Sequence, residues 1–228
     1  MKKLVLFLLC SVVNIGLFAQ QKFNGEINFI VSKEKEVKKF TLMVNDEWTI
    51  IKDETSAKHT FFYNSKNDSL IVLVNDEKPI AYITNYKTLI NTFKTSESSN
   101  SLYTTKLKNN FSKTDKTKKE EEITLQQFKS GENIAWCFQT QVSFSKIISL
   151  LLLNDLWLDV ENQQQIIANY SDANNKITSK ITTHSALFNK EMEKIANCQN
   201  ISLSYLQNNL SNKNELANIL AAFLKIKR

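Results

Sequence analysis

The chain has 228 residues, of which 42% are hydrophobic and 23% are charged, and its formal net charge is +6. This balance is typical of a folded globular protein and excludes a disordered chain, while the length fits one or two domains. Only three glycines and one proline are present. A glycine-rich phosphate loop is therefore excluded, because such a loop needs several residues that accept positive φ.

The N-terminus has the pattern of a secretory signal peptide. Lys2 and Lys3 supply positive charge, Leu4–Phe18 is almost wholly apolar, and Ala19 offers a small residue for cleavage. The apolar run is short for a membrane span, and no later segment is long enough for one. We expect residues 1–19 to be a signal peptide and residues 20–228 to form a single exported domain, periplasmic or extracellular, without a transmembrane span. Lipidation of Cys10 is a weaker alternative.

Six short segments with alternating apolar residues follow, separated by clusters of Asn, Asp, Lys and Ser. The clearest is a hairpin over residues 69–84, with a turn at 75–78 and then Pro79. The close spacing predicts an antiparallel meander and not βαβ units. The predicted strands are Phe23–Val31, Val37–Val44, Trp48–Ile51, His59–Tyr63, Ser69–Val74 and Ile80–Thr84.

Composition changes after residue 93. Residues 86–93 predict a last strand or one helical turn, and residues 94–119 are mostly Ser, Thr, Asn and Lys. The latter pattern predicts a polar mobile loop, or a loop that hides short strands.

Regular patterns return at Glu120. We expect strands at Glu121–Phe128 and Asn133–Gln141, a helix over Val142–Leu158, a hairpin from Glu161–Tyr170 to Lys176–Thr183, and helical character over His184–Cys198. The C-terminus predicts an amphipathic helix, because Asn212 and Glu215 have capping-pair spacing and one apolar stripe follows. The stripe is Leu216, Ile219, Leu220, Phe223 and Leu224. The expected fold is α+β but mainly β, a curved antiparallel sheet (a half barrel) packed against helices.

No catalytic or metal-binding pattern stands out. The sequence has no G-x-S-x-G elbow, and its two histidines, His59 and His184, have no metal-ligand spacing. A Cys137 nucleophile with either histidine as base is the enzyme arrangement to consider, but nothing near Cys137 would lower its pKa. We therefore predict a protein that is not an enzyme, with no catalytic, cofactor-binding or metal-binding residues and no cofactor.

Two cysteines, Cys137 and Cys198, remain after signal removal. An exported protein meets an oxidising compartment, so the two could form a disulfide. The alternative is two unrelated buried thiols, because cysteine is among the most buried residue types.

Aromatic residues exceed a single core stripe, and Phe61, Phe62 and Tyr63 put aromatics on both faces of one strand. The simpler interpretation is that one face packs on the sheet and the other on a helix. The functional interpretation is an apolar cavity between a curved sheet and helices. The wider aromatic set is Trp48, Phe61, Phe62, Tyr63, Tyr82, Tyr86, Trp136, Phe138 and Trp157.

Several strand patterns together resemble a known family. The series runs Phe23-x-Gly25-x-Ile27-x-Phe29, Phe40-x-Leu42-x-Val44, Ile50-Ile51-Lys52-Asp53, Phe61-Phe62-Tyr63-Asn64 and Ser69-Leu70-Ile71-x-Leu73. It resembles DUF4412-like secreted proteins of Bacteroidetes-type bacteria, whose sheet is similar to the LolA/LolB-like half barrel. The resemblance covers residues 23–93 and, weakly, 121–140. It departs where that family has Gly-Tyr-x-Cys, since residues 125–128 here read Leu-Gln-Gln-Phe. The family has no assigned activity, so the resemblance implies a fold only.

Two functions fit this sequence. The first is an exported cell-envelope binding protein that holds a lipid, a lipoprotein acyl chain or another apolar ligand between sheet and helices. The second is a structural or interaction protein of the periplasm or outer surface without a small-molecule ligand, docking an envelope partner through a sheet edge or the basic segment 106–119. We expect a monomer. Nucleic acid is excluded as a partner by export.

Overall fold

The computed structural model of the chain describes residues 23–55, 58–88, 110–139, 157–160, 163–183 and 185–202. Strands dominate this part of the chain, and one helix of ten residues, α4, accompanies them. In chain order the elements are β1 Gly25–Lys33, β2 Glu36–Val44, β3 Trp48–Asp53, β4 His59–Asn64, β5 Ser69–Val74, β6 Ile80–Asn85, β7 Ser112–Glu120, β8 Ile123–Ser130, β9 Asn133–Phe138, β10 Trp157–Val160, β11 Gln163–Ser171, β12 Asn175–Thr182, α4 Leu187–Ala196 and β13 Gln199–Ser202.

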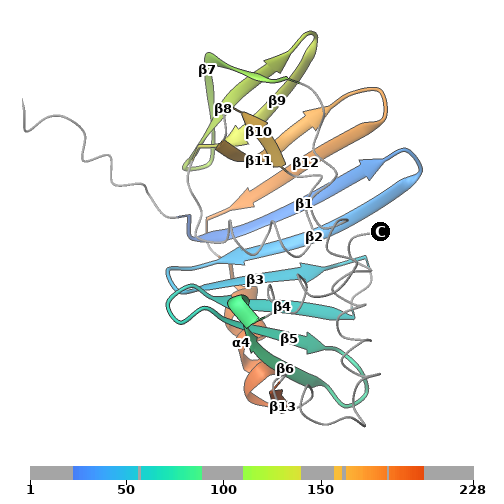
Figure 1. Ribbon diagram of the computed structural model, residues 1–228, viewed down its shortest axis with the longest axis vertical. Coiled ribbons are helices and arrows are strands. Elements are labelled where there is room, and N and C mark those ends of the chain that lie inside the picture. Colours follow the sequence, from blue (N-terminus) through green and yellow to red (C-terminus); the bar gives the residue numbers. More distant parts are fainter. Residues whose placement is uncertain are drawn as a thin grey trace, which may run out of the picture.

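The thirteen described strands form one sheet (Figure 1). From edge to edge the order is β13-β6-β5-β4-β3-β2-β1-β12-β11-β9-β8-β7, and β10 pairs with β11 off this path. Neighbouring described strands run antiparallel, except that β13 lies parallel to β6. The first six strands are a meander, as the sequence predicts. Strand β12 then returns beside β1 over eight residue pairs, from Glu26 facing Thr182 to Lys33 facing Asn175.

Turns between strands are built largely from asparagine and aspartate. The side-chain oxygens of Asn45, Asn64 and Asp172 each accept hydrogen bonds from the backbone N–H groups two and three residues later. These bonds give the turning backbone local partners. Glu34, Asp68 and Glu121 take positive φ in other turns, where a glycine is the usual residue. A chain with few glycines can therefore still make many tight turns.

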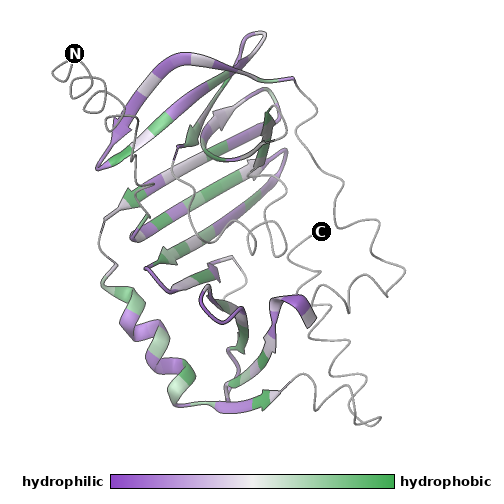
Figure 2. Cartoon of the chain, turned by 60° about the vertical axis from the view of Figure 1, so that its left-hand side comes forward, coloured by the Kyte–Doolittle hydropathy of each residue, from purple (hydrophilic) through white to green (hydrophobic). Residues whose placement is uncertain are grey.

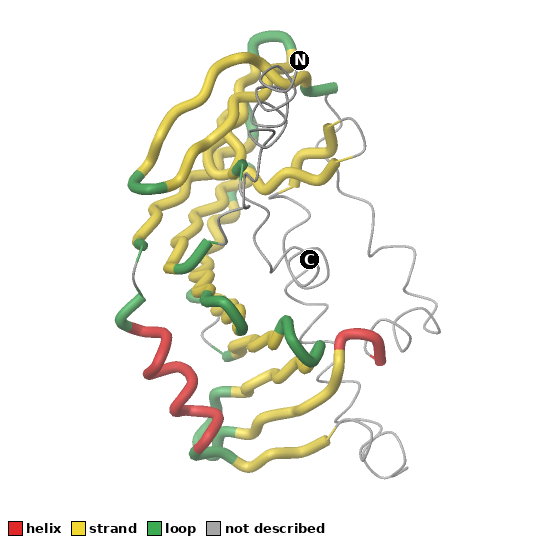
Figure 3. The backbone as a smooth tube through the Cα atoms, turned by 90° about the vertical axis from the view of Figure 1, so that its left-hand side faces the viewer, coloured by secondary structure: helices red, strands yellow, loops and turns green. Residues whose placement is uncertain are grey.

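Each strand alternates its side chains between two faces of the sheet, and hydropathy alternates along the strands accordingly (Figure 2). We call the face that carries Phe29, Phe40 and Phe61 the inner face, and the face that carries Met43 and Phe62 the outer face. The buried residues of the inner face belong to one large cluster, and those of the outer face to a second, smaller cluster. Figure 3 shows a bowed sheet with α4 on its convex side.

Helix α4 covers the outer face over the β2–β6 part of the sheet. Phe188, Met192 and Ile195 lie at helical spacing and pack against the smaller cluster, whose buried members are Met43, Ile50, Phe62, Ile71, Leu73 and Ala81. This arrangement confirms the prediction of helical character within His184–Cys198. It also confirms that one aromatic face of β4 packs under a helix.

Most predicted strands are confirmed, and the fold is mainly β. The predicted hairpin over residues 69–84 corresponds to β5 and β6, the predicted pair after Glu120 to β8 and β9, and the later predicted hairpin to β11 and β12. Within residues 86–93, residues 86–88 form a helical turn, and the remainder lies outside the described residues. The sheet is open, with β13 and β7 at its two edges, so a half barrel stays a prediction.

The structure decides two expectations from composition. The polar segment 94–119 is not a loop over its last part, where β7 begins at Ser112 and pairs with β8, which confirms the alternative of a hidden short strand. The lysine-rich composition of this segment gives no strand signal. Charged side chains nevertheless suit an edge strand, because they discourage its exposed N–H and C=O groups from pairing with another chain. The predicted helix over Val142–Leu158 is wrong at its end, because Trp157 and Leu158 belong to β10.

Other expectations fall on residues that the structure does not describe. These are the signal peptide at 1–19, residues 94–109, residues 142–156, His184 and the C-terminal helix that begins near Asn212.

Candidate functional site

The inner face presents a broad apolar surface across most of the sheet. Register places its large side chains side by side: Phe29 faces Phe40, and a second row runs from Ile51 through Phe61 to Val72. All five are buried. Cross-strand packing of this kind stabilises the sheet, and it also forms the sort of surface that lines apolar ligand sites.

Two buried hydroxyls on this apolar surface have no hydrogen-bond partner among the described residues. One is Oγ1 of Thr49, which is 1% exposed. It lies between Val44 on β2 and Tyr63 on β4. A buried hydroxyl without a partner costs about 1–3 kcal/mol, so such atoms are few in folded proteins. Ser179, further along the same face on β12, has a second unpartnered hydroxyl.

Tyrosines border the inner face near Thr49. The Tyr63 hydroxyl donates a 2.7 Å hydrogen bond to Asp68 Oδ1, and the Tyr63 ring meets Tyr86 edge-on at 6.3 Å. Burial raises the pKa of Tyr63 above the ordinary phenol value, and the hydrogen bond to Asp68 and the charge of that carboxylate raise it further. The phenol therefore stays protonated and acts as a donor.

His59 and Asp53 lie at the opposite end of strands β3 and β4. The pairing of Lys52 with Thr60 places Asp53 and His59 opposite each other on the inner face. The His59 ring stacks on Phe61 at 6.5 Å. Burial lowers the pKa of His59, the Asp53 charge opposes this change, and Lys58 adds to it. A largely neutral imidazole at neutral pH can both donate and accept hydrogen bonds, as a ligand site requires.

The structure does not bring Cys137 and His59 together. Cys137 lies on β9 and His59 on β4, and five strands separate these two in the sheet order. Burial also raises the pKa of the Cys137 thiol, so a thiolate is disfavoured there. Within the described ranges, no group of three or more His, Cys, Asp or Glu side chains is arranged to hold a metal ion.

The disulfide that the sequence left open is absent from the structure, where Cys137 and Cys198 are both free. Seven strands lie between β9, which carries Cys137, and β6, beside which Cys198 packs. Cys137 belongs to the inner cluster and Cys198 to the outer one. A bridge needs Cα atoms about 4.4–6.8 Å apart, which this arrangement cannot supply. Spacing in the sequence could not reveal that the two cysteines lie on different faces.

Helix α4 carries a buried carboxylate that the sequence pattern does not predict. Glu191 is 4% exposed, and its carboxylate accepts hydrogen bonds from Lys194 Nζ at 2.7 and 2.8 Å. Lys52 Nζ of β3 lies 3.9 Å from Glu191 Oε1 and 3.0 Å from Glu54 Oε1. The only signal in the sequence is that this glutamate occupies a position which helical spacing places on the same face as the apolar residues of α4. The contact joins α4 to the middle of the sheet.

A shallow pocket of ≈ 410 Å³ lies where α4 meets the turn after β5. Its lining combines two apolar residues with charged side chains of both signs, and comprises Leu73, Asn75, Asp76, Pro79, Lys190, Glu193, Lys194 and Asn197. The charged side chains distinguish this pocket from the inner face, and their balanced charge selects no particular class of ligand.

Helix α4 is far too short to cross a bilayer, and the described part of the chain contains no other candidate for a membrane-spanning helix.

Comparisons with known proteins give little further information. No family model matches the chain, and no curated protein gives a significant match. A structure titled "Structure of PNGF-II in C2 space group" is similar with a TM-score of 0.40 and 12% identity over 83% of this chain and 32% of that chain. A second, "Structure of PNGF-II in P21 space group", has a TM-score of 0.38 and 15% identity over 79% and 32%. The chain thus spans about a third of the length of these proteins, and likeness at this level supports no conclusion. The resemblance to DUF4412-like proteins stays a prediction.

Proposed function

We propose that the protein is an exported binding protein of the cell envelope that holds an apolar ligand, such as a lipid or a lipoprotein acyl chain, against the inner face of its sheet. In this proposal the bowed sheet acts as the half barrel that the sequence pattern predicts. Apolar side chains contact the ligand's hydrocarbon part, and a few polar atoms at fixed places orient its polar group.

The observation that carries the proposal is the Thr49 hydroxyl. It is buried on an apolar surface, and no residue in the described part of the chain is its hydrogen-bond partner. Retaining such an atom costs stability unless something else satisfies it. A carbonyl or hydroxyl of a bound lipid would do so, and the Tyr63 phenol beside it would contribute a second polar contact.

A second candidate is an interaction protein without a small-molecule ligand. The observation in its favour is that inner-face side chains are already well buried, with Leu70 at 0% and Phe61 at 1% exposure. A filled core of this kind leaves the inner face to structural packing.

The two proposals are separated by the Thr49→Val variant, which removes the hydroxyl but keeps the shape of the side chain. Purified protein would be extracted and its bound lipids identified by mass spectrometry, and a fluorescent fatty acid would then be titrated into the delipidated protein. The binding proposal predicts recovered lipid and binding about fivefold weaker for Thr49→Val, the effect of one lost hydrogen bond.

Thr60→Val is the matched control. Thr60 is equally buried, but it lies on the outer face, and its hydroxyl accepts a hydrogen bond from Asn75 at 3.4 Å. Its replacement should reduce stability and leave fatty-acid affinity unchanged. Lipid-free protein that binds no fatty acid, with Thr49→Val only gaining stability, would contradict the ligand proposal and favour the interaction protein.

A further inference from the structure

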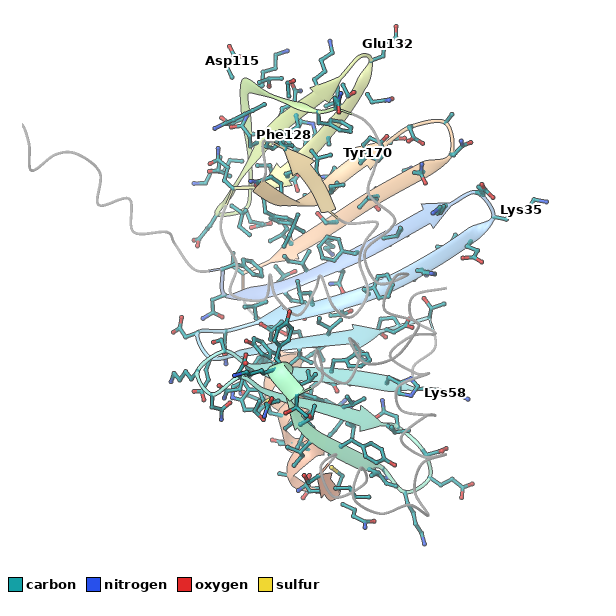
Figure 4. All side chains as sticks on the ribbon, in the orientation of Figure 1. Lys35, Lys58, Asp115, Phe128, Glu132 and Tyr170 are labelled. Carbon is teal, nitrogen blue, oxygen red and sulfur yellow. The ribbon has the colours of Figure 1, made fainter. Side chains whose placement is uncertain are left out.

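A distinct surface lies on the outer face, toward the tips of three neighbouring hairpins. Hairpins β1–β2, β11–β12 and β8–β9 end on the same side of the molecule (Figure 1). Lys35 marks the tip of β1–β2 and projects away from the sheet in Figure 4. Helix α4 runs beside the other half of the sheet (Figure 3). The outer face near these tips is therefore left without a helix among the described elements.

The registers place three lysines around an apolar centre on this surface. Ile30 faces Lys39 on β2 and Thr178 on β12. Two residue pairs closer to the tips, Ser32 lies between Val37 and Lys176. Two residue pairs in the other direction, Asn28 faces Lys180. Side chains two residues apart on one strand share a face, so all of these project from the outer face.

The apolar side chains of this surface are exposed. Ile30 is 43% exposed and Val37 is 51% exposed. Ile134, which is 41% exposed, extends the patch across β11, because the pairing of Ala135 with Tyr170 sets Ile134 beside Ser171. Large exposed hydrophobic residues in the described part of the chain are few, and these three share one surface.

The lysines of this surface are free to meet an external anion. Lys39, Lys176 and Lys180 are exposed, and none of the three makes an ion pair in the described part of the chain. The carboxylate of Glu26, on the same face further from the tips, already accepts hydrogen bonds from Asn28 and Ser185. The surface is therefore positive as well as apolar.

We propose that this surface, formed by Ile30, Val37, Ile134, Lys39, Lys176 and Lys180, docks the protein on the surface of an anionic lipid bilayer. Exposed isoleucine and valine side chains would enter the interface, and the lysine stems would lie over apolar surface with their ammonium groups at the lipid phosphates. Each lysine near an anionic membrane strengthens binding roughly fivefold. The inference does not depend on a ligand at the inner face.

The test is co-sedimentation of the mature chain with vesicles of phosphatidylcholine alone or with added phosphatidylglycerol. We expect binding to the anionic vesicles only, weakened by added salt because the charges are screened. The triple variant Lys39→Gln, Lys176→Gln, Lys180→Gln should bind about 100-fold more weakly, given roughly fivefold for each lysine. Ile30→Thr, which keeps a β-branched side chain, should weaken binding several-fold by removing apolar contact.

Matched controls separate this surface from net charge. The triple variant Lys58→Gln, Lys78→Gln, Lys87→Gln loses the same charge from exposed positions around β4–β6, and Leu187→Ser removes an exposed apolar residue from α4. Both should bind like the unaltered protein. Equal losses in the two lysine triples, or no binding of the unaltered protein to anionic vesicles, would overturn the proposal; the second result would leave an acidic protein as the occupant to examine. Failure here would not affect the fatty-acid measurement at Thr49.

Discussion

At the scale of single residues, the two hydrogen-bonded tyrosines make a pH-dependent contribution to stability. Burial raises the pKa of Tyr63 and Tyr170, and each phenol also donates to a nearby carboxylate, Asp68 and Asp172 respectively. A raised pKa in the folded state means that folding favours the protonated phenol. The resulting stability is fully present below the ordinary phenol pKa of about 10 and is lost as pH rises above it.

A spectrophotometric titration of the folded protein checks this prediction. Two phenols should ionise later than the ordinary tyrosines, and Tyr63→Phe and Tyr170→Phe should each remove one late step. If all phenols ionise together near their ordinary pKa while the protein stays folded, the two hydrogen bonds are not maintained in solution.

The buried Glu191 carboxylate predicts a second effect at this scale. Glu191→Gln would leave Lys194 and Lys52 facing a neutral amide, and both lysines are partly exposed, which moderates the cost. We expect a loss of about 1–2 kcal/mol in the free energy of unfolding, measured with urea. The neighbouring exposed Glu193 provides the control, since Glu193→Gln should change stability by less than about 0.5 kcal/mol. Equal effects of the two substitutions would show that Glu191 is not an anchor for α4.

Residue-level chemistry was predicted only in part. The two-sided aromatic character of Phe61 and Phe62 follows directly from strand periodicity, and the structure places them in different clusters. The unpartnered Thr49 hydroxyl, the buried Glu191 and the facing of Asp53 and His59 could not be predicted. Each depends on the exact register between strands or on which face α4 covers, and a single sequence does not specify either.

At the scale of elements, Gly25 fixes how β1 begins beside β12. Its φ is +152°, and a Cβ there would lie 2.3 Å from the Thr182 carbonyl oxygen. Gly25→Ala combines a strained backbone with a clash against main chain, and it should cost about 3 kcal/mol or more. Gly131 has φ +60° but open space around it, so Gly131→Ala should cost only about 1 kcal/mol. Thermal unfolding of both variants measures the difference, and similar losses would show that β1 and β12 do not approach this closely.

Strands could be predicted where apolar residues alternate clearly along the sequence, and could not be predicted where charged residues replace that alternation. Strands β1–β6 alternate apolar residues and were predicted within a few positions. Strand β7 has four lysines in nine residues and no such alternation. Its sequence therefore predicts a loop, although the segment pairs with β8. The end of the apolar run at Trp157–Leu158 fits a helix in the sequence but is a strand in the structure, because a short apolar run does not distinguish a helix from a buried strand.

At the scale of the whole molecule, the sheet is organised by pairings between distant segments. Strand β12 returns to β1 from the far end of the chain, and β13 adds to β6 in parallel after α4. Such contacts follow from burial of both partners and not from local sequence, so the meander was predictable and its extension to thirteen described strands was not. This extension creates the long inner face, on which the proposed ligand site lies.

The two faces of the sheet have different proposed functions. The inner face holds the proposed apolar ligand, whereas the outer face is occupied by α4 in one half and exposes the lysine-bearing surface in the other. Phe61 and Phe62 provide a matched pair for testing this difference, since they are adjacent, almost fully buried and on opposite faces.

The most direct measurement is fluorine NMR of the delipidated protein with 4-fluorophenylalanine at position 61 or at position 62, during titration with a fatty acid. We expect a saturable shift of the signal from position 61, with the signal from position 62 unchanged, because the ligand contacts only the inner face. A signal at position 61 that does not respond at saturating fatty acid, or a response confined to position 62, would contradict the assignment of the inner face as the ligand site.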